Sequence, residues 1–406
     1  MIVEIHPGQA HGTVAAPPSK SMAHRLLICA GLAHGTSRIR GLDFNQDVLA
    51  TIDCLTALGA NCAISGDTVT VQGMNPRKAK PSSPLCCRES GSTLRFFIPL
   101  ALLNGELTRF TGSEKLLSRP LSIYEALCRD HGFLFRQDRS SLEVAGHLKS
   151  GDFTLPGDIS SQFITGLLFA LPLTPASSTI RLLPPVESRS YIDLTLQALH
   201  TFGIQATWQD AYTLVIPGGQ SYQSRDMTVE GDYSGAAFLD ALNTLGSHLT
   251  VTGLNPESLQ GDRVYKRHLQ SLKEGCPTID LSDCPDLGPI LFAVAAARHG
   301  AIFTGTRRLK LKESNRAAAM AQELAAFGTS VTVEDNSVVV AAADFHRPDR
   351  ILTGHNDHRI VMALAVLLTL TGGKLQGAQA VNKSFPDFFE KLKQSGITIH
   401  FHEADN

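Results

Sequence analysis

LTALGANCAISGDTVTVQG, residues 55–73, reads as the end of a helix that continues directly into a β-hairpin. Its first residues fit a last helical turn, and Gly59 stands where helices commonly end on a residue with a positive φ angle. Apolar and polar side chains then alternate, as in half-buried strands, and Gly66-Asp67 separates two such runs. The stretch therefore predicts a helix followed by two antiparallel strands.

The same pattern recurs along the chain, which indicates a repeated structural unit. Related helix ends fall at similar intervals, except for a shortened interval before Gly328, at Gly132, Gly203, Gly275, Gly328 and Gly396. A second pattern, an apolar helix end followed by a glycine turn and an alternating run, occurs at residues 31–41, 101–112, 241–253, 295–305 and 367–377, and residues 168–182 are a version with Pro172 and Pro175 in the turn. Together the patterns predict six β-α-β-α-β-β units, of which the fourth is shortened and the last lacks its second strand.

Three units in each half of the chain predict two α/β domains. A polar, Gly- and Ser-rich stretch at residues 218–226 separates the halves, and an N-terminal strand precedes the first unit. We therefore expect residues 1–18 and 228–406 to form one domain and residues 19–227 the other. The strands exclude a helical solenoid, and no G-x-G-x-x-G motif follows the first strand, which argues against a dinucleotide-binding fold.

The composition limits the classes of partner. Charged residues make up 18% of the chain and the formal net charge is -2, so no overall field attracts nucleic acid. The longest apolar runs are shorter than the ~20 residues that a membrane helix needs. Because the N-terminus lacks the features of a signal peptide and the eight cysteines show no C-x-x-C spacing, we expect a soluble cytoplasmic protein with reduced thiols and no membrane partner.

Cations are concentrated in five short polar motifs, which predicts locally built sites for small anions. Arginine binds carboxylate or phosphate through paired hydrogen bonds, and lysine acts as a point charge. A single exposed cation usually has no such role, but five motifs together favour a functional site. The motifs are residues 18–25, 188–191, 310–316, 356–359 and 382–386.

These motifs resemble those of the EPSP synthases, the 3-phosphoshikimate 1-carboxyvinyltransferases of the enolpyruvyl transferase family. The matching segments occur in the family's order over the whole chain: PSKSMAHR (18–25), ESGSTLR (89–95), RP (119–120), SSQ (160–162), Ser188 with YID (191–193), PD (285–286), KESNR (312–316), NDHR (356–359) and KSFP (383–386). The resemblance implies two inside-out α/β barrel domains, each with three repeat units, helices inside and sheets outside. It places the active site in the cleft between the domains.

The resemblance also implies a reaction. The enolpyruvyl group of phosphoenolpyruvate is transferred to the 5-hydroxyl of shikimate 3-phosphate by addition and elimination, and phosphate is released on the pathway to chorismate. No metal or organic cofactor and no partner other than these two substrates is expected, and the protein is expected to be a monomer.

Site residues follow from the resemblance, residue by residue. Phosphoenolpyruvate is expected on Lys20, Gly91, Arg119, Gln162, Arg316, Arg359 and Lys383. Shikimate 3-phosphate is expected on Lys20, Ser21, Arg25, Ser160, Ser161, Gln162, Ser188, Tyr191, Asp286, Arg308 and Lys312. Ser160 and Ser161 are equally suited to cap the helix that follows them, and capping is compatible with phosphate binding.

The chemistry requires a proton donor toward the methylene carbon and a proton acceptor at the attacking hydroxyl. We assign Asp286 as the base, Glu313 as the acid and Lys20 as a group that shares proton transfer. If residues 312–316 open a helix, Glu313 and Arg316 share one of its faces. His358 has two open roles, a phosphate contact or the orientation of its neighbours, and we favour the second.

Two departures from the family pattern bear on binding, and two other functions remain open. Arg308 and Glu89 stand where many relatives have asparagine, which affects the expected contacts with shikimate 3-phosphate and phosphoenolpyruvate, respectively. One alternative is enolpyruvyl transfer to UDP-N-acetylglucosamine. The other is a non-catalytic protein that binds phosphorylated metabolites, although a binding protein has less need of the paired acids Asp286 and Glu313.

Overall fold

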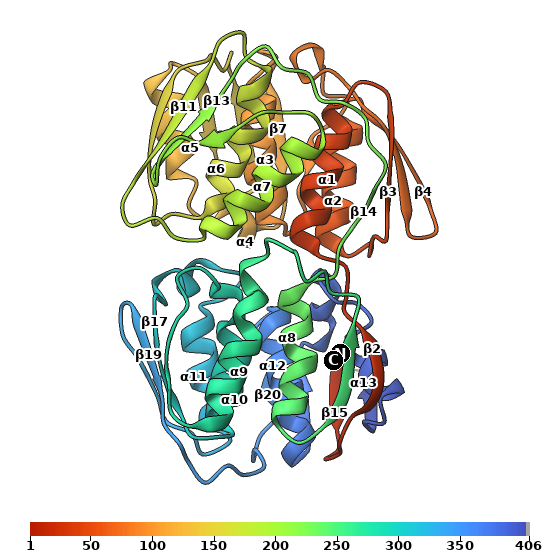
Figure 1. Cartoon of the computed structure of the whole chain (residues 1–406), viewed down its shortest axis with the longest axis vertical. Coiled ribbons are helices and arrows are strands. Elements are labelled where there is room, and N and C mark those ends of the chain that lie inside the picture. Colours follow the sequence, from red (N-terminus) through yellow and green to blue (C-terminus); the bar gives the residue numbers. More distant parts are fainter. Residues whose placement is uncertain (403–406) are drawn as a thin grey trace. The chain divides into compact units, whose positions relative to one another are not determined.

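The computed structural model describes residues 1–402, which divide into two compact units (Figure 1). The N-terminal unit is Lys20–Val229, and the C-terminal unit is Met1–Ser19 together with the chain from Glu230 onward. Ser19, Thr228 and Val229 thus fall on the other side of the expected boundary, because the Ser19 amide donates to the Glu230 carbonyl while Thr228 pairs with Arg40. Within the described residues, no helix is both long and apolar enough to cross a membrane.

The N-terminal unit has three sheets with one strand order. In each, the first two strands are parallel and the remaining pairs are antiparallel. The sheets are β14 (Met227–Thr228), β3 (Thr36–Arg40), β5 (Thr68–Gln72), β4 (Asn61–Ser65); β6 (Leu85–Cys86), β7 (Thr108–Thr111), β9 (Ser141–Ala145), β8 (Leu134–Gln137); and β10 (Asp152–Pro156), β11 (Ser178–Leu183), β13 (Thr213–Ile216), β12 (Thr207–Trp208).

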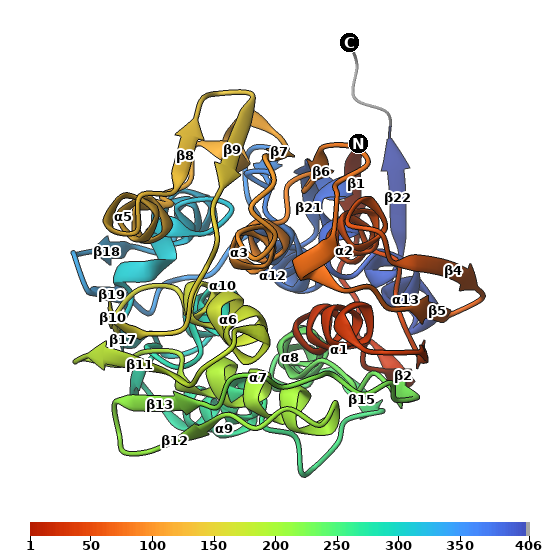
Figure 2. The same ribbon diagram turned by 90° about the horizontal axis from the view of Figure 1, so that it is seen from above.

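The sheets of this unit surround its helices (Figure 2). Helices α3 and α6 are buried on almost every side, as their nearly continuous apolar sequences require. Their polar residues lie within the first five positions of each helix, near the end where backbone amide groups need partners. The helices are α1 (Lys20–Leu32), α2 (Gln46–Ala57), η1 (Pro76–Lys78), α3 (Gly91–Ala101), α4 (Glu114–Leu117), α5 (Ser122–Asp130), α6 (Ser161–Ala170), η2 (Leu171–Leu173) and α7 (Arg189–Thr201).

The C-terminal unit uses the two N-terminal strands to complete its sheets. Strand β1 lies antiparallel between β21 and β22, and β2 lies parallel to β15. The last unit thus receives from the chain start the strand that its own sequence lacks. The sheets are β20 (Leu352–Thr353), β21 (Gly373–Gln376), β1 (Ile2–Ile5), β22 (Ile399–His402); β16 (Thr278–Asp280), β17 (Ala301–Thr304), β19 (Ser337–Val340), β18 (Val331–Val333); and β15 (His248–Thr252), β2 (His11–Ala15).

Helices α10 and α12 form the interior of the C-terminal unit. Every residue of α10 and residues 358–369 of α12 are buried. The polar first residues of α12, His358 and Arg359, are therefore buried as well. The helices are α8 (Tyr233–Thr244), η3 (Gly261–Val264), α9 (Tyr265–Glu274), η4 (Pro285–Leu287), α10 (Gly288–Ala296), η5 (Arg307–Leu311), α11 (Arg316–Ala325), α12 (His358–Thr371), η6 (Ala378–Lys383) and α13 (Phe388–Gln394).

The predicted repeat is present, with one departure. Strands β4 and β5 form the expected hairpin, and Gly59 has a φ of 105°. Four of the five related glycines also have positive φ angles. Gly275 instead has an extended φ of 175°, and the chain continues into β16, which pairs in parallel with β17 rather than forming a hairpin. The missing hairpin is the physical reason for the shortened fourth unit.

Candidate functional site

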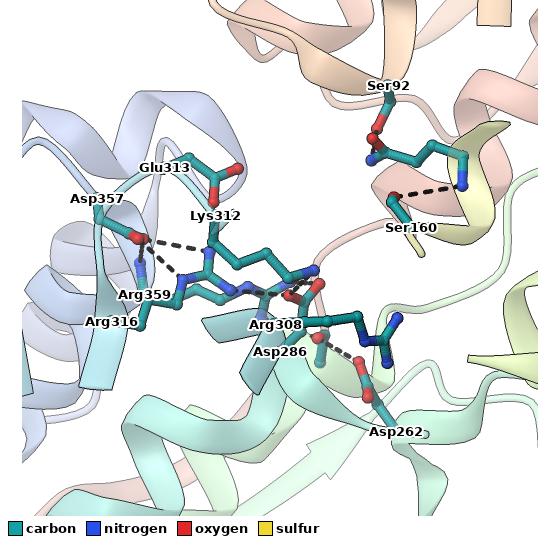
Figure 3. A network of polar contacts seen from close by, with 12 residues as sticks. Ser92, Ser160, Asp262, Asp286, Arg308, Lys312, Glu313, Arg316, Asp357 and Arg359 are labelled. Carbon is teal, nitrogen blue, oxygen red and sulfur yellow. Dashed lines mark hydrogen bonds and ion pairs between the residues drawn. The ribbon is translucent and has the colours of Figure 1, made fainter. Parts of the chain in front are cut away.

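Arg316 is the centre of a buried ionic network in the C-terminal unit (Figure 3). Its side chain is 1% exposed. Nε donates to Asp357 Oδ2 at 2.9 Å, Nη1 to Asp286 Oδ1 at 2.8 Å and Nη2 to Glu313 Oε2 at 2.7 Å. One guanidinium therefore holds three carboxylates, and these charge-assisted hydrogen bonds fix all four side chains.

Two helix starts bring these residues together. Asp357 caps α12 by accepting a hydrogen bond from the Arg359 amide at 3.0 Å. Asn315 caps α11, so that helix begins at Arg316. Residues 312–315 therefore precede the helix, and the condition under which Glu313 and Arg316 would share a helix face is not met, because the asparagine side chain accepts from the Ala318 amide and the helix begins after it. Glu313 contacts Arg316 from outside the helix.

Asp286, in η4, is paired with three cations. Besides Arg316 Nη1, it contacts Arg359 Nη2 at 3.0 Å and Lys312 Nζ at 3.2 Å. Burial opposes its ionisation, but the charges of Arg359, Lys312 and Arg316 together hold its pKa well below the usual value. Burial also lowers the pKa of Lys312, and Asp286 partly offsets that effect. Asp286 and Lys312 thus lie side by side as an ion pair.

Arg359 extends the network to a second buried acid. Its Nη1 donates to the Ser234 hydroxyl at 2.8 Å, and that hydroxyl donates to Asp262 Oδ2 at 2.5 Å. Ser234 lies on α8 and Asp262 in η3, far from Arg359 in the sequence. Neither residue lies in one of the five polar motifs, and both meet Arg359 only through packing of segments far apart in the chain.

The remaining residues expected in this unit lie around the same helix starts. Lys383 Nζ donates to the Asn356 carbonyl at 2.7 Å, and Asn356 has a left-handed φ of 52°. Arg308 is buried in η5 and donates to the Ser282 carbonyl. His358 is buried as the first residue of α12, with Nδ1 3.9 Å from Asp357 Oδ1. The orienting role of the histidine stays a prediction.

In the N-terminal unit, Lys20 pairs with an acid. Its Nζ donates to Asp47 Oδ2 at 2.8 Å, and both side chains are mostly buried. Lys20 is the first residue of α1, and Asp47 lies in the first turn of α2, which Asn45 caps. The resemblance gave Asp47 no role, although its place at a helix start was a usable signal.

Several polar side chains gather around the backbone of Gly91, the first residue of α3. A Cβ built on Gly91 would lie 2.8 Å from Arg119 Nη1 and 3.2 Å from Arg95 Nη1. Gln162 donates to the Ser92 hydroxyl at 2.8 Å and accepts from Arg95 Nη1 at 2.7 Å. The missing side chain at Gly91 thus leaves room for two arginines. The resemblance includes Arg95 in the motif of residues 89–95 but implies no role for it.

The start of α6 carries the expected serine pair. Ser160 caps the helix by accepting from the Gln162 amide at 3.4 Å, and Ser161 is its first residue and buried. The capping role is therefore confirmed. Ser188 precedes α7 with a left-handed φ of 54°, and its side chain is buried. Two helix starts, with their unpaired amide groups, thus carry hydroxyls in this unit.

Arg25 links α1 to α7. It donates from Nε to the Thr195 hydroxyl at 2.9 Å, from Nη1 to the Ser21 carbonyl at 2.6 Å and from Nη2 to the Tyr191 carbonyl at 2.9 Å. Burial lowers the pKa of its guanidinium to about 10. The expected carboxylate ligand of Arg25 would therefore meet a side chain already fixed by the protein.

The structure divides the expected site residues between the two units. The C-terminal unit holds Asp286, Arg308, Lys312, Glu313, Arg316, Arg359 and Lys383. The N-terminal unit holds Lys20, Ser21, Arg25, Gly91, Arg119, Ser160, Ser161, Gln162, Ser188 and Tyr191. Within each unit, most of these residues lie at the starts of inner helices, so the repeat that builds the fold also assembles the polar groups.

Solved structures share this fold. An EPSP synthase from Acinetobacter baumannii superimposes with a TM-score of 0.80 at 22% identity, over 99% of this chain and 100% of that chain. The enolpyruvyl transferase NikO from Streptomyces tendae gives a TM-score of 0.79 at 16% identity, over 100% and 99% of the two chains. These likenesses confirm the expected two-domain enolpyruvyl transferase fold.

Sequence comparisons define the family. Residues 6–392 match the family model described as EPSP synthase (3-phosphoshikimate 1-carboxyvinyltransferase). A 3-phosphoshikimate 1-carboxyvinyltransferase of Clostridium kluyveri is 38% identical, with 98% of each chain covered. One from Clostridium beijerinckii is 36% identical, with 97% of each covered. The match spans both units and all the polar motifs, and the chain therefore belongs to the EPSP synthase family.

Proposed function

We propose that this chain transfers the enolpyruvyl group of phosphoenolpyruvate to the 5-hydroxyl of shikimate 3-phosphate, with release of phosphate. The observation that carries the proposal is the network around Arg316, in which two candidate proton-transfer acids, Asp286 and Glu313, share one buried guanidinium. Family membership supports the same reaction. It does not favour the sister activity on UDP-N-acetylglucosamine or a role limited to binding.

The cations provide the binding energy for two substrates that each carry two anionic groups. Each substrate carries a phosphate and a carboxylate, which repel one another unless cations lie between them. We assign phosphoenolpyruvate to the side chains of Lys20, Arg119, Gln162, Arg316, Arg359 and Lys383 and to the backbone at Gly91. Arg119 supports this assignment, because its guanidinium already lies against the backbone of Gly91.

We assign shikimate 3-phosphate to hydroxyls and helix starts of the N-terminal unit together with three groups of the C-terminal unit. The paired serines at the start of α6 suit a phosphate, since amide groups and the helix dipole there favour negative charge. The residues are Lys20, Ser21, Arg25, Ser160, Ser161, Gln162, Ser188, Tyr191, Asp286, Arg308 and Lys312.

Proton transfer is assigned to Asp286, Glu313 and Lys20. In the addition, Asp286 accepts the proton of the 5-hydroxyl with Lys312 beside it, Glu313 protonates the methylene carbon, and Lys20 shares the transfer. In the elimination, the new methyl group returns a proton to Glu313, the C–O bond to phosphate breaks, and Asp286 gives up its proton as phosphate leaves. The pKa of Asp286 is held low by Arg359, Lys312 and Arg316, which makes it a weak base. A substrate anion that draws on the same arginines weakens their hold and raises the pKa of Asp286 toward a useful range.

The test is phosphate release from the purified protein. Phosphoenolpyruvate is supplied with shikimate 3-phosphate in one assay and with UDP-N-acetylglucosamine in the other, and no metal is added. We expect release with shikimate 3-phosphate only. Release with the nucleotide sugar would show enolpyruvyl transfer to UDP-N-acetylglucosamine instead. No release with either acceptor would favour a binding protein.

Gly91→Ala should weaken phosphoenolpyruvate binding while the fold is kept. The added Cβ meets Arg119 Nη1 at 2.8 Å, and because that atom ends a flexible side chain, the arginine moves and the backbone does not. We expect the KM for phosphoenolpyruvate to rise about tenfold, the change that corresponds to ~1.4 kcal/mol, with a smaller change in the KM for shikimate 3-phosphate. Gly151→Ala is a control for a glycine change away from the site, because a Cβ there meets no atom within 4 Å and the backbone is not in the left-handed region. Equal effects on both KM values would contradict the assignment of Gly91.

A further inference from the structure

Asp262 is a buried acid with no role in the proposed chemistry. It lies in η3, is 4% exposed and accepts a hydrogen bond from the Ser234 hydroxyl at 2.5 Å (Figure 3). Burying a carboxyl group is costly unless it makes compensating interactions. A buried acid that contacts a residue of the candidate site therefore invites a functional explanation.

The direction of the hydrogen bonds connects Asp262 to Arg359. A serine hydroxyl has one proton, and when it donates that proton to Asp262 its oxygen accepts from Arg359 Nη1, at 2.8 Å. The other terminal nitrogen of the arginine, Nη2, donates to Asp286 Oδ2 at 3.0 Å. The guanidinium of Arg359 is thus held at both terminal nitrogens. Nη1 contacts Ser234, which in turn donates to Asp262, and Nη2 contacts Asp286.

We propose that Asp262 is a positioning residue that acts through Ser234 to orient the guanidinium of Arg359 toward Asp286 and toward the anionic substrate. An acceptor behind the serine keeps the hydroxyl proton pointing away from the arginine, so the oxygen lone pairs face Nη1. This inference rests on the proposed role of Arg359 as a ligand of phosphoenolpyruvate.

The groups around Asp262 make its effect depend on pH. Asp286 in η4, Arg359 on α12, Asp232 at the cap of α8 and Cys284 before η4 all interact with it electrostatically. Burial first, then the charge of Asp286, raises the pKa of Asp262 to about 6, while Arg359 opposes the shift. The carboxylate is therefore present above about pH 6 and is lost as the pH falls through that value. The hold on Arg359 should weaken over the same range.

The test compares Asp262→Asn, Ser234→Ala and the double variant, with kcat and KM measured from pH 5 to 8. At pH 7.5 we expect each single variant to raise the KM for phosphoenolpyruvate about tenfold, as for the loss of one charge-assisted hydrogen bond, with kcat changed less than KM. The double variant should be no worse than either single one, because both remove the same connection. We expect the KM of the unmodified protein for phosphoenolpyruvate to rise below pH 6. This rise should be absent in Asp262→Asn.

Two outcomes would overturn the proposal: additive effects in the double variant, or a rise in KM below pH 6 that persists in Asp262→Asn. If Asp262→Asn folds poorly, Ser234→Ala tests the same connection between Asp262 and Arg359. Asp240→Asn is the matched control, since Asp240 lies on the same helix as Ser234 but accepts from Tyr265 at 2.5 Å, and it should leave KM and the pH profile unchanged.

Arg359→Gln separates this inference from the proposed function. If that variant raises the KM for phosphoenolpyruvate while Asp262→Asn does not, the positioning role fails and the role of Arg359 stands. If Arg359→Gln leaves the KM unchanged, the assigned role of Arg359 fails, and the inference built on it fails as well.

Discussion

Asp286→Asn should lower kcat by about 10²- to 10⁴-fold, the usual contribution of a positioned acid or base, and retain only part of the binding of shikimate 3-phosphate, to which Asp286 is also assigned. The amide keeps the size of the side chain but does not accept a proton at neutral pH. Glu313→Gln should give a loss of similar size, because the two acids serve different proton transfers. The rate is followed by phosphate release, and binding of each substrate is measured separately by calorimetry.

Asp335→Asn is the matched control for the loss of one acid. Asp335 also contacts two cations, Arg307 and Lys310, but these pairs are exposed to solvent. We expect wild-type kcat from this variant. If Asp286→Asn and Glu313→Gln both retained full turnover, the acids would be structural partners of Arg316 and the proposed proton transfers would be wrong.

Arg316→Met should reduce the free energy of unfolding by about 3–5 kcal/mol, as expected when one partner of a buried ion pair is removed. Asp357 is fully buried and would lose its main counter-charge. Burial by itself would raise the pKa of Asp357, but the charge of Arg316 outweighs burial and the pKa is lowered. Its ionised form thus adds stability that is present above the unfolded pKa and lost as the pH falls through the folded pKa. In the variant Asp357 is easier to protonate, so the stability deficit should shrink toward acid pH.

Urea unfolding at pH 7.5 and pH 5, followed by circular dichroism, measures this effect through the transition midpoint. Arg307→Met is the control, because that arginine pairs with Asp335 at the surface and should change stability little. A deficit for Arg316→Met that is no larger than that of the control would show that the three carboxylates find other partners. A deficit that grows toward acid pH would contradict the assignment to Asp357.

Local sequence predicted those parts of the site that depend on neighbouring residues. Ser160 caps α6 as its position before an apolar run indicated, and the motifs that carry Asp286, Lys312 and Arg359 come together in the structure. The expected binding and catalytic roles of these residues remain proposals. The acids and hydroxyls that hold the cations were harder to find, because Asp47, Ser234 and Asp262 gain their partners only through packing.

The sequence by itself determined the repeat. Glycines with positive φ end five of its helices, and alternating apolar residues define its hairpins, because both signals depend on a few adjacent residues. Only the tertiary structure decided which strands complete the sheets and which charges meet. Strand β1 inserts between β21 and β22, and Arg316 gathers Asp286, Glu313 and Asp357. Such pairings join residues far apart in the chain, and no periodicity within one segment records the partner against which it will pack.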